Sequence, residues 1–233
     1  MPTEKTKLPS AFSLFNPSWE AVQRSLPVFG ILYLLPLVTA LSGAFNRPQG
    51  SGKQATIVSD GLFGGWSPLA IGTVVGTGLI VLLIGLVIGI IIQAMLQVAE
   101  FEAAEGKKLE FGQVWQRSKP LILRLFGLSL LTGLIIVGGF ILLIVPGLIF
   151  LRRYFLAPYF LIDKNLSITG ALKESAKASK PYAGAIWGLI GVGILLSLTS
   201  IIPVVGGLVS FVLGAAYSVA PALRYGEIKK AGY

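Results

Sequence analysis

Long stretches without any charged residue restrict the fold of this chain more than any other feature of its sequence. Four such stretches cover residues 26–45, 61–99, 125–151 and 181–223. Each exceeds the roughly 18 apolar residues that indicate a membrane-spanning helix. A soluble domain of 233 residues could hardly enclose several helices that are apolar on every face. The sequence therefore predicts an all-α membrane protein.

Composition narrows the chemistry that such a protein can carry. The chain is 54% hydrophobic and 12% charged, with a mean hydropathy of +0.81, whereas soluble proteins have about 25% charged residues. It contains no cysteine and no histidine, which removes thiolate nucleophiles, the commonest general base and the commonest transition-metal ligands. No nucleophile with a nearby base and no phosphate-binding loop is visible either. We therefore expect a protein that is not an enzyme and that binds no cofactor or metal.

The final uncharged stretch is too long for one span. As a single helix, its 43 residues would measure roughly 65 Å, about twice the thickness of the hydrocarbon core. It must fold back once, and Pro203 with the glycines after it marks the turn. Pro146 and Gly147 interrupt the chain in the same way. We predict one integral-membrane domain over residues 1–233, with spans near residues 26–45, 71–98, 121–143, 147–164, 183–201 and 204–223.

The distribution of lysine and arginine predicts the orientation of these spans. Basic residues accumulate on the cytoplasmic side of a membrane. Only Arg47 and Lys53 fall between the first two predicted spans, whereas the region near residue 120, the segment before the fifth span and both tails hold nearly all the others. With six spans these basic segments share one side, so we expect both termini in the cytoplasm. A five-span alternative, with one helix over residues 121–151, would place four lysines of the later loop outside.

Three similar segments indicate an internal repeat. The tripeptides Ser25-Leu26-Pro27, Ser118-Lys119-Pro120 and Ser179-Lys180-Pro181 each end a short polar and apolar stretch and precede an apolar one. Apolar residues recur at three- and four-residue steps in the stretches before the second and third tripeptides, as in amphipathic helices. We predict six transmembrane helices arranged as three hairpins, each preceded by a short cytoplasmic interfacial helix. The alternative is that Ser-x-Pro is simply a frequent pattern at the start of a helix.

Two adjacent arginines are the most unusual charges in the sequence. Arg152 and Arg153 follow the predicted turn at Pro146 by only a few residues, which places them within the hydrocarbon or at its edge. A charge there costs about 3 kcal/mol unless it reaches water, a partner or a lipid phosphate. They could form an anion or lipid-headgroup site that faces an internal cavity. Equally, they could extend outward to the membrane surface or pair with backbone carbonyls at the Pro146 break.

Two further groups of polar residues are candidate sites. Gln93 and Gln97 are one helical turn apart on the second span and precede Glu100, so they could bind a ligand or headgroup, although ordinary hydrogen bonding between helices is favoured. A basic inner surface follows the fourth span and consists of Lys164, Lys173, Lys177 and Lys180. Each of these lysines near an anionic leaflet contributes roughly 1 kcal/mol to lipid binding. Topology alone also requires such charges, so lipid recognition is the less favoured explanation.

The net charge of +9 does not indicate nucleic-acid binding. The basic residues are divided among several loops and are not gathered in one patch. We therefore expect no nucleic-acid partner. The expected partners are membrane lipids, including anionic ones, and another membrane protein or a second copy of the chain.

A set of residues in the second half of the chain resembles a known family. These residues are Pro146-Gly147, Arg153-Tyr154, Pro158 and Ala171-Leu172-Lys173-Glu174-Ser175. In this order they are similar to the membrane domain of glycerophosphoryl diester phosphodiesterases and to its stand-alone relatives, bacterial integral-membrane proteins of unknown function. The resemblance is best over residues 114–202 and implies a multi-pass protein of the cytoplasmic (inner) cell membrane.

The chain departs from that family in two ways. Gly170 stands where the family more often has a glutamate, so a capping box with Ser167 is missing. The catalytic barrel of the phosphodiesterases needs histidines, and this sequence has none. The resemblance therefore implies a stand-alone membrane domain without the hydrolase. We expect a non-enzymatic module that interacts with lipids or membrane proteins; the alternative is a transporter or lipid-handling protein with a cavity near Arg152 and Arg153.

Overall fold

The computed structural model describes residues 8–45, 68–201 and 206–232, and all regular elements in these ranges are helical. The α-helices are α1 (Phe15–Arg24), α2 (Leu26–Phe45), α4 (Pro68–Ala104), α5 (Phe111–Ser118), α6 (Ile122–Leu142), α7 (Ile144–Tyr154), α8 (Ala157–Lys164), α9 (Ile168–Ala178), α10 (Ala183–Leu198), α11 (Gly206–Tyr217) and α12 (Ala220–Lys230). Three short 3₁₀ helices are η1 (Phe12–Leu14), η2 (Lys119–Leu121) and η3 (Thr199–Ile201).

Five helical segments within the described residues are long and apolar enough to cross a membrane. They are Leu79–Ala104, Phe111–Leu142, Ile144–Lys164, Ala183–Ile201 and Gly206–Lys230. The prediction of an all-helical chain compatible with several membrane crossings is thus confirmed for the described residues. The count of six spans and their arrangement as three hairpins stay predictions. Part of the proposed turn at Pro203 lies outside the described residues.

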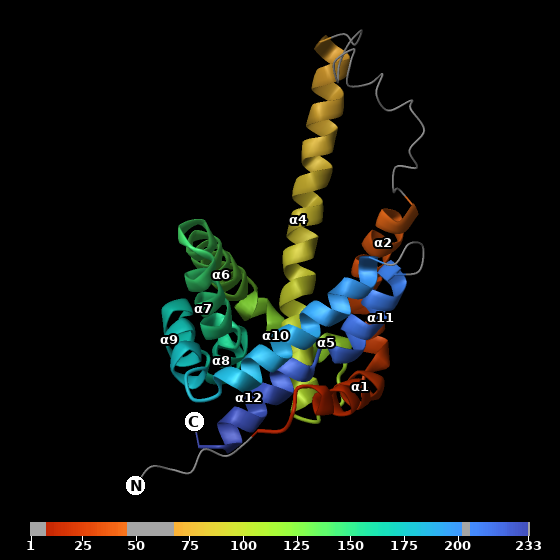
Figure 1. Cartoon of the computed structure of the whole chain (residues 1–233). Coiled ribbons are helices and arrows are strands. Elements are labelled where there is room, and N and C mark those ends of the chain that lie inside the picture. Colours follow the sequence, from red (N-terminus) through yellow and green to blue (C-terminus); the bar gives the residue numbers. More distant parts are fainter. Residues whose placement is uncertain (1–7, 46–67, 202–205, 233) are drawn as a thin grey trace.

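Helix α4 is the longest element and stands apart from the others over its first half (Figure 1). Leu79 and Val81 in this half are more than half exposed, and the helix carries no charge before Glu100. A helix surface that is apolar on all sides and lies away from the other described helices requires an apolar solvent. Helices α1 and α12 lie at the opposite end of the molecule from the start of α4 (Figure 1).

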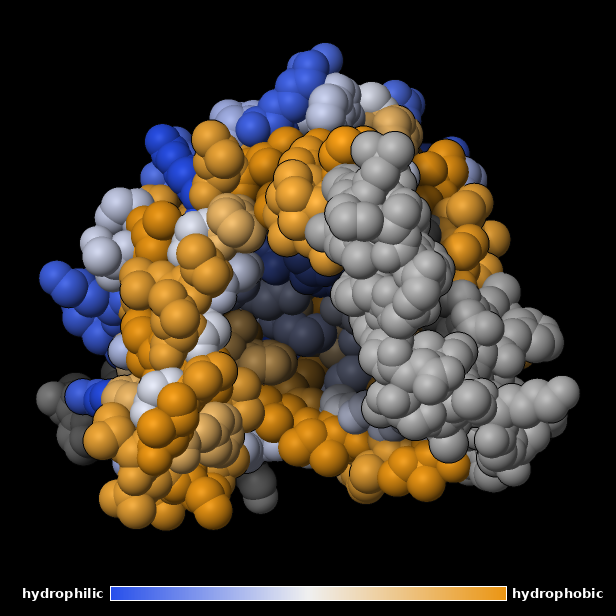
Figure 2. Space-filling model, turned by 90° about the horizontal axis from the view of Figure 1, so that it is seen from above, coloured by the Kyte–Doolittle hydropathy of each residue, from blue (hydrophilic) through white to orange (hydrophobic). Residues whose placement is uncertain are grey.

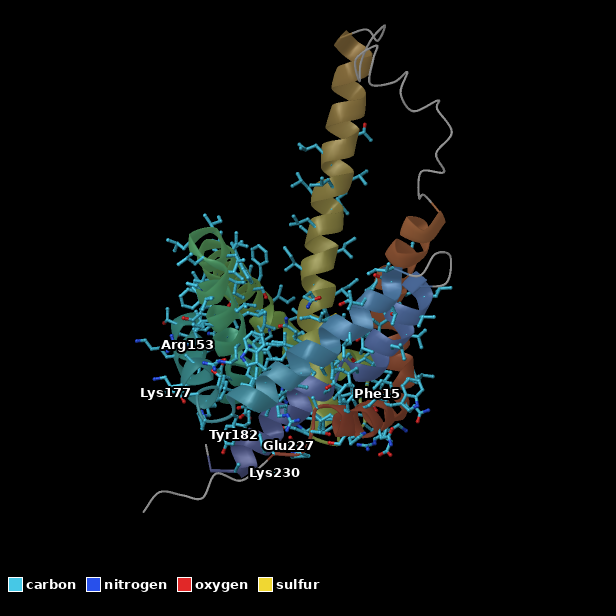
Figure 3. All side chains as sticks on the ribbon, viewed as in Figure 1. Phe15, Arg153, Lys177, Tyr182, Glu227 and Lys230 are labelled. Atoms are coloured by element: carbon cyan, nitrogen blue, oxygen red, sulfur yellow. The ribbon has the colours of Figure 1, made fainter. Side chains whose placement is uncertain are left out.

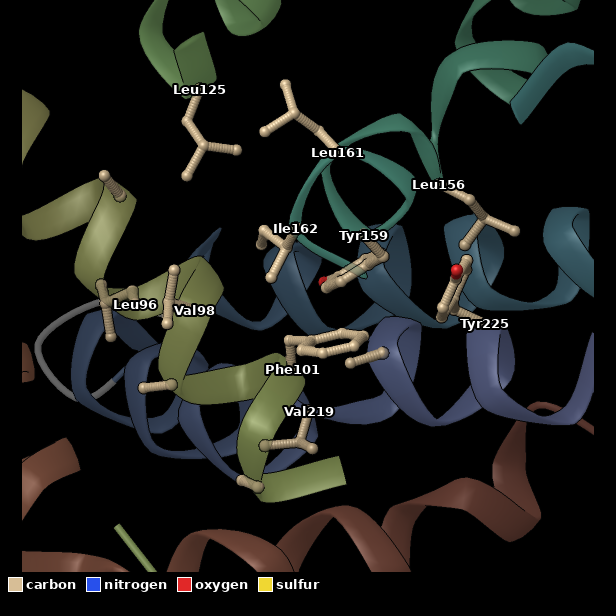
Figure 4. Close-up of a cluster of buried hydrophobic side chains, with 14 of the residues drawn as sticks. Leu96, Val98, Phe101, Leu125, Leu156, Tyr159, Leu161, Ile162, Val219 and Tyr225 are labelled. Carbon is tan, nitrogen blue, oxygen red and sulfur yellow. The ribbon is translucent and has the colours of Figure 1, made fainter. Parts of the chain in front are cut away.

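The hydrophobic core lies where the last turns of α4 meet α8 and α12 (Figure 4). The Tyr225 ring of α12 contacts Phe160 of α8 edge-on, with ring centroids 4.8 Å apart. Phe101 of α4 and Tyr159 of α8 complete the cluster at 6.1 and 6.2 Å from Tyr225. These aromatic contacts join three helices that are distant in sequence.

Helices α6 and α7 form a tight pair whose turn differs from the predicted one. The chain reverses at Leu143, which is extended (φ −166°, ψ 149°), a few residues before Pro146. Pro146 instead lies in the first turn of α7, where a proline costs no helix hydrogen bond. Gly139 and Gly147 permit the close approach of the two helices, because a Cβ atom on Gly147 would lie 2.5 Å from the Phe140 ring.

Two helical segments are broken just before an Ala-Pro pair. The break between α7 and α8 precedes Ala157-Pro158, and the break between α11 and α12 precedes Ala220-Pro221. Each proline lies in the first turn of the new helix, where its missing N–H is tolerated. Both Ala residues are fully buried.

A helix from elsewhere in the chain repairs the hydrogen bonding at each break. The Ser175 hydroxyl of α9 donates to the Arg153 carbonyl at 2.7 Å, and the Ser18 hydroxyl of α1 donates to the Ala216 carbonyl at 2.8 Å. Arg153 and Ala216 each precede their Ala-Pro pair by the same number of residues. A carbonyl at that position loses its helix donor at the break and would otherwise stay unpaired.

Candidate functional site

Helix α9 forms one wall of the candidate site. The Ser167 hydroxyl caps its first turn by accepting a hydrogen bond from the Gly170 N–H at 3.2 Å, so the cap forms without the glutamate of a capping box. Residues at three- and four-residue steps are buried against the protein, namely Ala171, Leu172, Ser175 and Ala178. The opposite face of α9 therefore presents its lysines outward.

Serine hydroxyls fix α9 to the last turn of α7. The Arg153 carbonyl accepts a hydrogen bond from the Ser175 hydroxyl at 2.7 Å. The Ser179 hydroxyl donates to the Ser175 carbonyl at 2.7 Å and lies 3.3 Å from the Arg153 carbonyl. Both serines are fully buried. Because buried hydrogen bonds of this kind are costly to leave unmade, the position of Arg153 relative to the α9 lysines is set by the fold.

The resulting groove gathers positive charge. It has a volume of about 460 Å³. Its lining residues are Arg153, Lys164, Leu166, Gly170, Lys173, Glu174, Ala176, Lys177 and Lys180. Figure 3 shows Arg153 and Lys177 projecting on the same outer side of the molecule. The structure thus brings one of the two predicted arginines together with all four lysines of the predicted basic inner surface.

Charge within the groove is only partly neutralised. Glu174 is its single carboxylate and lies 3.7 Å from the Lys164 Nζ and 3.4 Å from the Lys177 Nζ. The Arg153 Nε atom is buried and has no hydrogen-bond partner among the described residues. Arginine and lysine donors arranged in this way suit a phosphate or carboxylate ligand.

Arg152 does not belong to this groove. It is partly buried, its Nε also has no hydrogen-bond partner in the described part of the chain, and it is not a lining residue of the groove. The two adjacent arginines therefore have different surroundings, since neighbouring helical residues point about 100° apart.

The predicted glutamines occupy a separate hollow. Gln93 and Gln97 of α4 line a space of about 380 Å³ between α4 and α6, together with Ser129 of α6. Glu100, the third member of the predicted stripe, instead accepts a hydrogen bond from the Tyr159 hydroxyl at 3.4 Å. Seen from above, the molecule is hollowed, with hydrophobic residues on the parts of the rim that are not grey and more hydrophilic residues on the floor (Figure 2).

Arg224 was missed by sequence reasoning, although it is fully buried. Its Nη2 donates to the Pro9 carbonyl at 2.9 Å. Its Nη1 lies 2.7 Å from a Glu227 carboxylate oxygen, but the geometry is that of an ion pair without a hydrogen bond. In the sequence Arg224 only ends an uncharged stretch, and no spacing signal shows that it anchors the N-terminal segment.

A polar link joins α8 and α12 at the edge of the aromatic cluster. Asp163 accepts hydrogen bonds from the Tyr225 hydroxyl at 2.6 Å and from the Lys229 Nζ at 2.7 Å. This link ties down the end of α8 from which Lys164 enters the basic groove. Within the described ranges, no three His, Cys, Asp or Glu side chains gather as a possible metal site.

No protein-family model, curated protein or solved structure matches this chain. The resemblance to the phosphodiesterase membrane domain therefore stays a prediction, and the groove itself is the basis for a functional proposal.

Proposed function

We propose that this protein is a non-enzymatic module of a bacterial cytoplasmic membrane that binds the phosphate-bearing headgroups of anionic lipids in the basic groove. The observation that carries this proposal is the convergence of Arg153 with Lys164, Lys173, Lys177 and Lys180 on one space of about 460 Å³. The proposal includes six spans arranged as three hairpins, with both termini in the cytoplasm.

The geometry of α9 supports a headgroup ligand. Lys173 and Lys177 are four residues apart on α9 and so lie on one helix face, and Lys180, in the turn just after the helix, lines the same groove. Arg153 faces them from α7. Lysines beside an anionic surface contribute roughly 1 kcal/mol each, and an arginine can bind a phosphate through two parallel hydrogen bonds.

The surroundings of the groove favour a lipid over a free anion. Arg153 belongs to a segment that is long and apolar enough to cross a membrane. Leu148 and Ile149, one turn earlier on the same helix, are exposed. A headgroup held at Arg153 would therefore have apolar helix surface beside it for its acyl chains.

Lipid binding to the purified full-length chain tests the proposal. Native mass spectrometry of the protein in detergent would compare bound phosphatidylglycerol with bound phosphatidylcholine. We expect preferential binding of phosphatidylglycerol. The triple variant Lys173→Gln, Lys177→Gln, Lys180→Gln should weaken it about tenfold or more, given roughly 1 kcal/mol for each lysine. Inorganic phosphate at millimolar concentration should not displace the lipid.

A matched variant separates the groove from net charge. Lys107→Gln, Lys108→Gln, Lys119→Gln removes the same charge from residues that do not line the groove. It should retain most of the phosphatidylglycerol binding. An equal loss in both triple variants would show that the lipid responds to overall charge and would refute the groove as the site.

Transport or lipid handling is the second candidate function. The hollow with a hydrophilic floor in Figure 2 and the broken helices before Ala157 and Ala220 favour it, because broken spans line the central sites of many transporters. In this alternative the hollow holds water or substrate at mid-depth, whereas the module proposed above needs no passage for a substrate.

A further inference from the structure

The basic groove holds more positive charge than a single phosphate group neutralises. Five of its lining residues are basic, one is acidic and the other three are uncharged, which leaves an excess of four positive charges. A phosphodiester headgroup such as that of phosphatidylglycerol is a single anion. Cations gathered in one small space repel one another unless anions lie among them. The groove is therefore better matched by a ligand with more than one negative group.

The one carboxylate of the groove serves only two of the five basic residues. Its oxygens lie 3.7 Å from the Lys164 Nζ and 3.4 Å from the Lys177 Nζ, so Glu174 is shared between these two lysines. The other three basic residues take part in no ion pair within the described part of the chain, and these are Arg153, Lys173 and Lys180. The excess charge thus belongs mainly to these three side chains.

These three basic residues are spread along the groove. Lys173 lies in the middle of α9, which ends at Ala178, and Lys180 follows the end of the helix. At a rise of 1.5 Å per residue, Lys180 is displaced from Lys173 by more than roughly 7 Å along the helix axis. Arg153 faces this wall from α7, where its carbonyl accepts a hydrogen bond from the Ser175 hydroxyl at 2.7 Å. Basic residues separated in this way favour two phosphate groups over one.

The charge and its distribution narrow the class of lipid. We propose that the groove binds a lipid whose headgroup carries two phosphate groups joined by a short linker, as in cardiolipin; this inference rests on the headgroup binding proposed above. Basic pockets on the cytoplasmic side of membrane proteins bind such headgroups. Once the first phosphate is bound, the second binds at a high effective concentration because both belong to one molecule. The volume of about 460 Å³ lies within the range of small-molecule pockets.

Competition between two lipids tests this inference on the purified full-length chain in detergent. Native mass spectrometry would compare cardiolipin with phosphatidylglycerol that has the same acyl chains, at equal total phosphate. We expect cardiolipin to bind about tenfold more tightly, a gain that comes from linking two binding groups. The double variant Lys173→Gln, Lys180→Gln should bring the ratio of the two affinities close to one. Both lysines are exposed, so their replacement leaves the hydrophobic core intact.

A matched double variant controls for overall charge. Lys107→Gln, Lys108→Gln removes the same charge from exposed residues that do not line the groove, and it should leave the affinity ratio unchanged. An equal loss of the ratio in both double variants would overturn the inference. So would a ratio near one in the unaltered protein while phosphatidylglycerol is still preferred over phosphatidylcholine. If neither anionic lipid is preferred over phosphatidylcholine, the groove is not a headgroup site and the proposed function itself fails.

Discussion

Buried serines connect helices of this protein through hydrogen bonds to backbone carbonyls. Ser175 bonds to the Arg153 carbonyl at the break between α7 and α8, and Ser18 bonds to the Ala216 carbonyl at the break between α11 and α12. In lipid, a carbonyl freed by a helix break has no water to bond with. A single hydroxyl at the right position therefore permits a break that the membrane would otherwise penalise.

We predict that Ser175→Ala lowers the free energy of unfolding by about 1 kcal/mol, because it removes the hydrogen bond to the Arg153 carbonyl and this is the net value of one intramolecular hydrogen bond. The measurement is the midpoint of thermal unfolding in detergent. Ser197→Ala is the matched control, because the Ser197 hydroxyl bonds to the Gly193 and Ile194 carbonyls of its own helix. Equal shifts in the two variants would show that the bond to Arg153 has no special role.

The closest helix contact at a glycine in this protein does not follow from a spacing rule. The sequence contains several Gly-x-x-x-Gly patterns, yet a Cβ atom on Gly85, Gly89 or Gly184 would meet nothing within 4 Å, and only Gly188 among the described members of these patterns lies close to a neighbour, Ala11. The closest backbone approach at the described glycines is between Gly139 of α6 and Gly147 of α7. These two glycines lie on different helices, so only the turn at Leu143 brings them together.

For the α6–α7 pair we predict that Gly147→Ala destabilises the protein by about 1–3 kcal/mol through overpacking against the Phe140 ring. Gly138→Ala is a neighbouring control, since a Cβ atom there would meet nothing within 4 Å. It should be neutral or slightly stabilising, because alanine favours helix. Thermal unfolding of both variants in the same detergent decides between these outcomes. Similar losses for the two would contradict the tight packing of this pair.

Over the whole molecule, three short helices each pack on longer helical segments, and two of them, α1 and α9, do so at a helix break. Helix α9 contacts α7 and α8, α1 contacts α11 and α12, and α5 contacts α4. Helices α5 and α9 each pack on the segment that ends the predicted hairpin before them. Helix α1, which precedes the first hairpin, packs on the segment that ends the third. This circular order is what three repeats around a common centre would produce, and it supports the repeat hypothesis.

The absence of cysteine allows a direct test of topology in cells. We expect single cysteines at Lys53 and Lys173 to react with a membrane-impermeant thiol reagent from opposite sides of the membrane, as the positive-inside rule requires. A cysteine at Leu156, which is fully buried, should react from neither side. Labelling of positions 53 and 173 from the same side would refute the six-span topology. Reaction at 156 would favour the transport alternative.

The sequence by itself determined the class of the protein. Long uncharged stretches predict spanning helices, because the polarity of a segment can be read without its tertiary contacts. The absence of histidine and cysteine excludes imidazole and thiolate chemistry in the same way, since composition does not depend on the fold. The candidate residues could also be named from the sequence, because a charge or amide within or beside an apolar stretch is unusual in any tertiary arrangement.

Only the tertiary structure decided which of these residues work together. Arg153 joins the lysines of α9, whereas Arg152 does not, because the buried serines orient α9 against one side of α7. Gln97 lines a hollow shared with α6, whereas Glu100 accepts a hydrogen bond from Tyr159 of α8, so the two residues belong to different surroundings. Such groupings depend on contacts between residues far apart in the chain, and helical periodicity carries no information about which helix will lie opposite a given face.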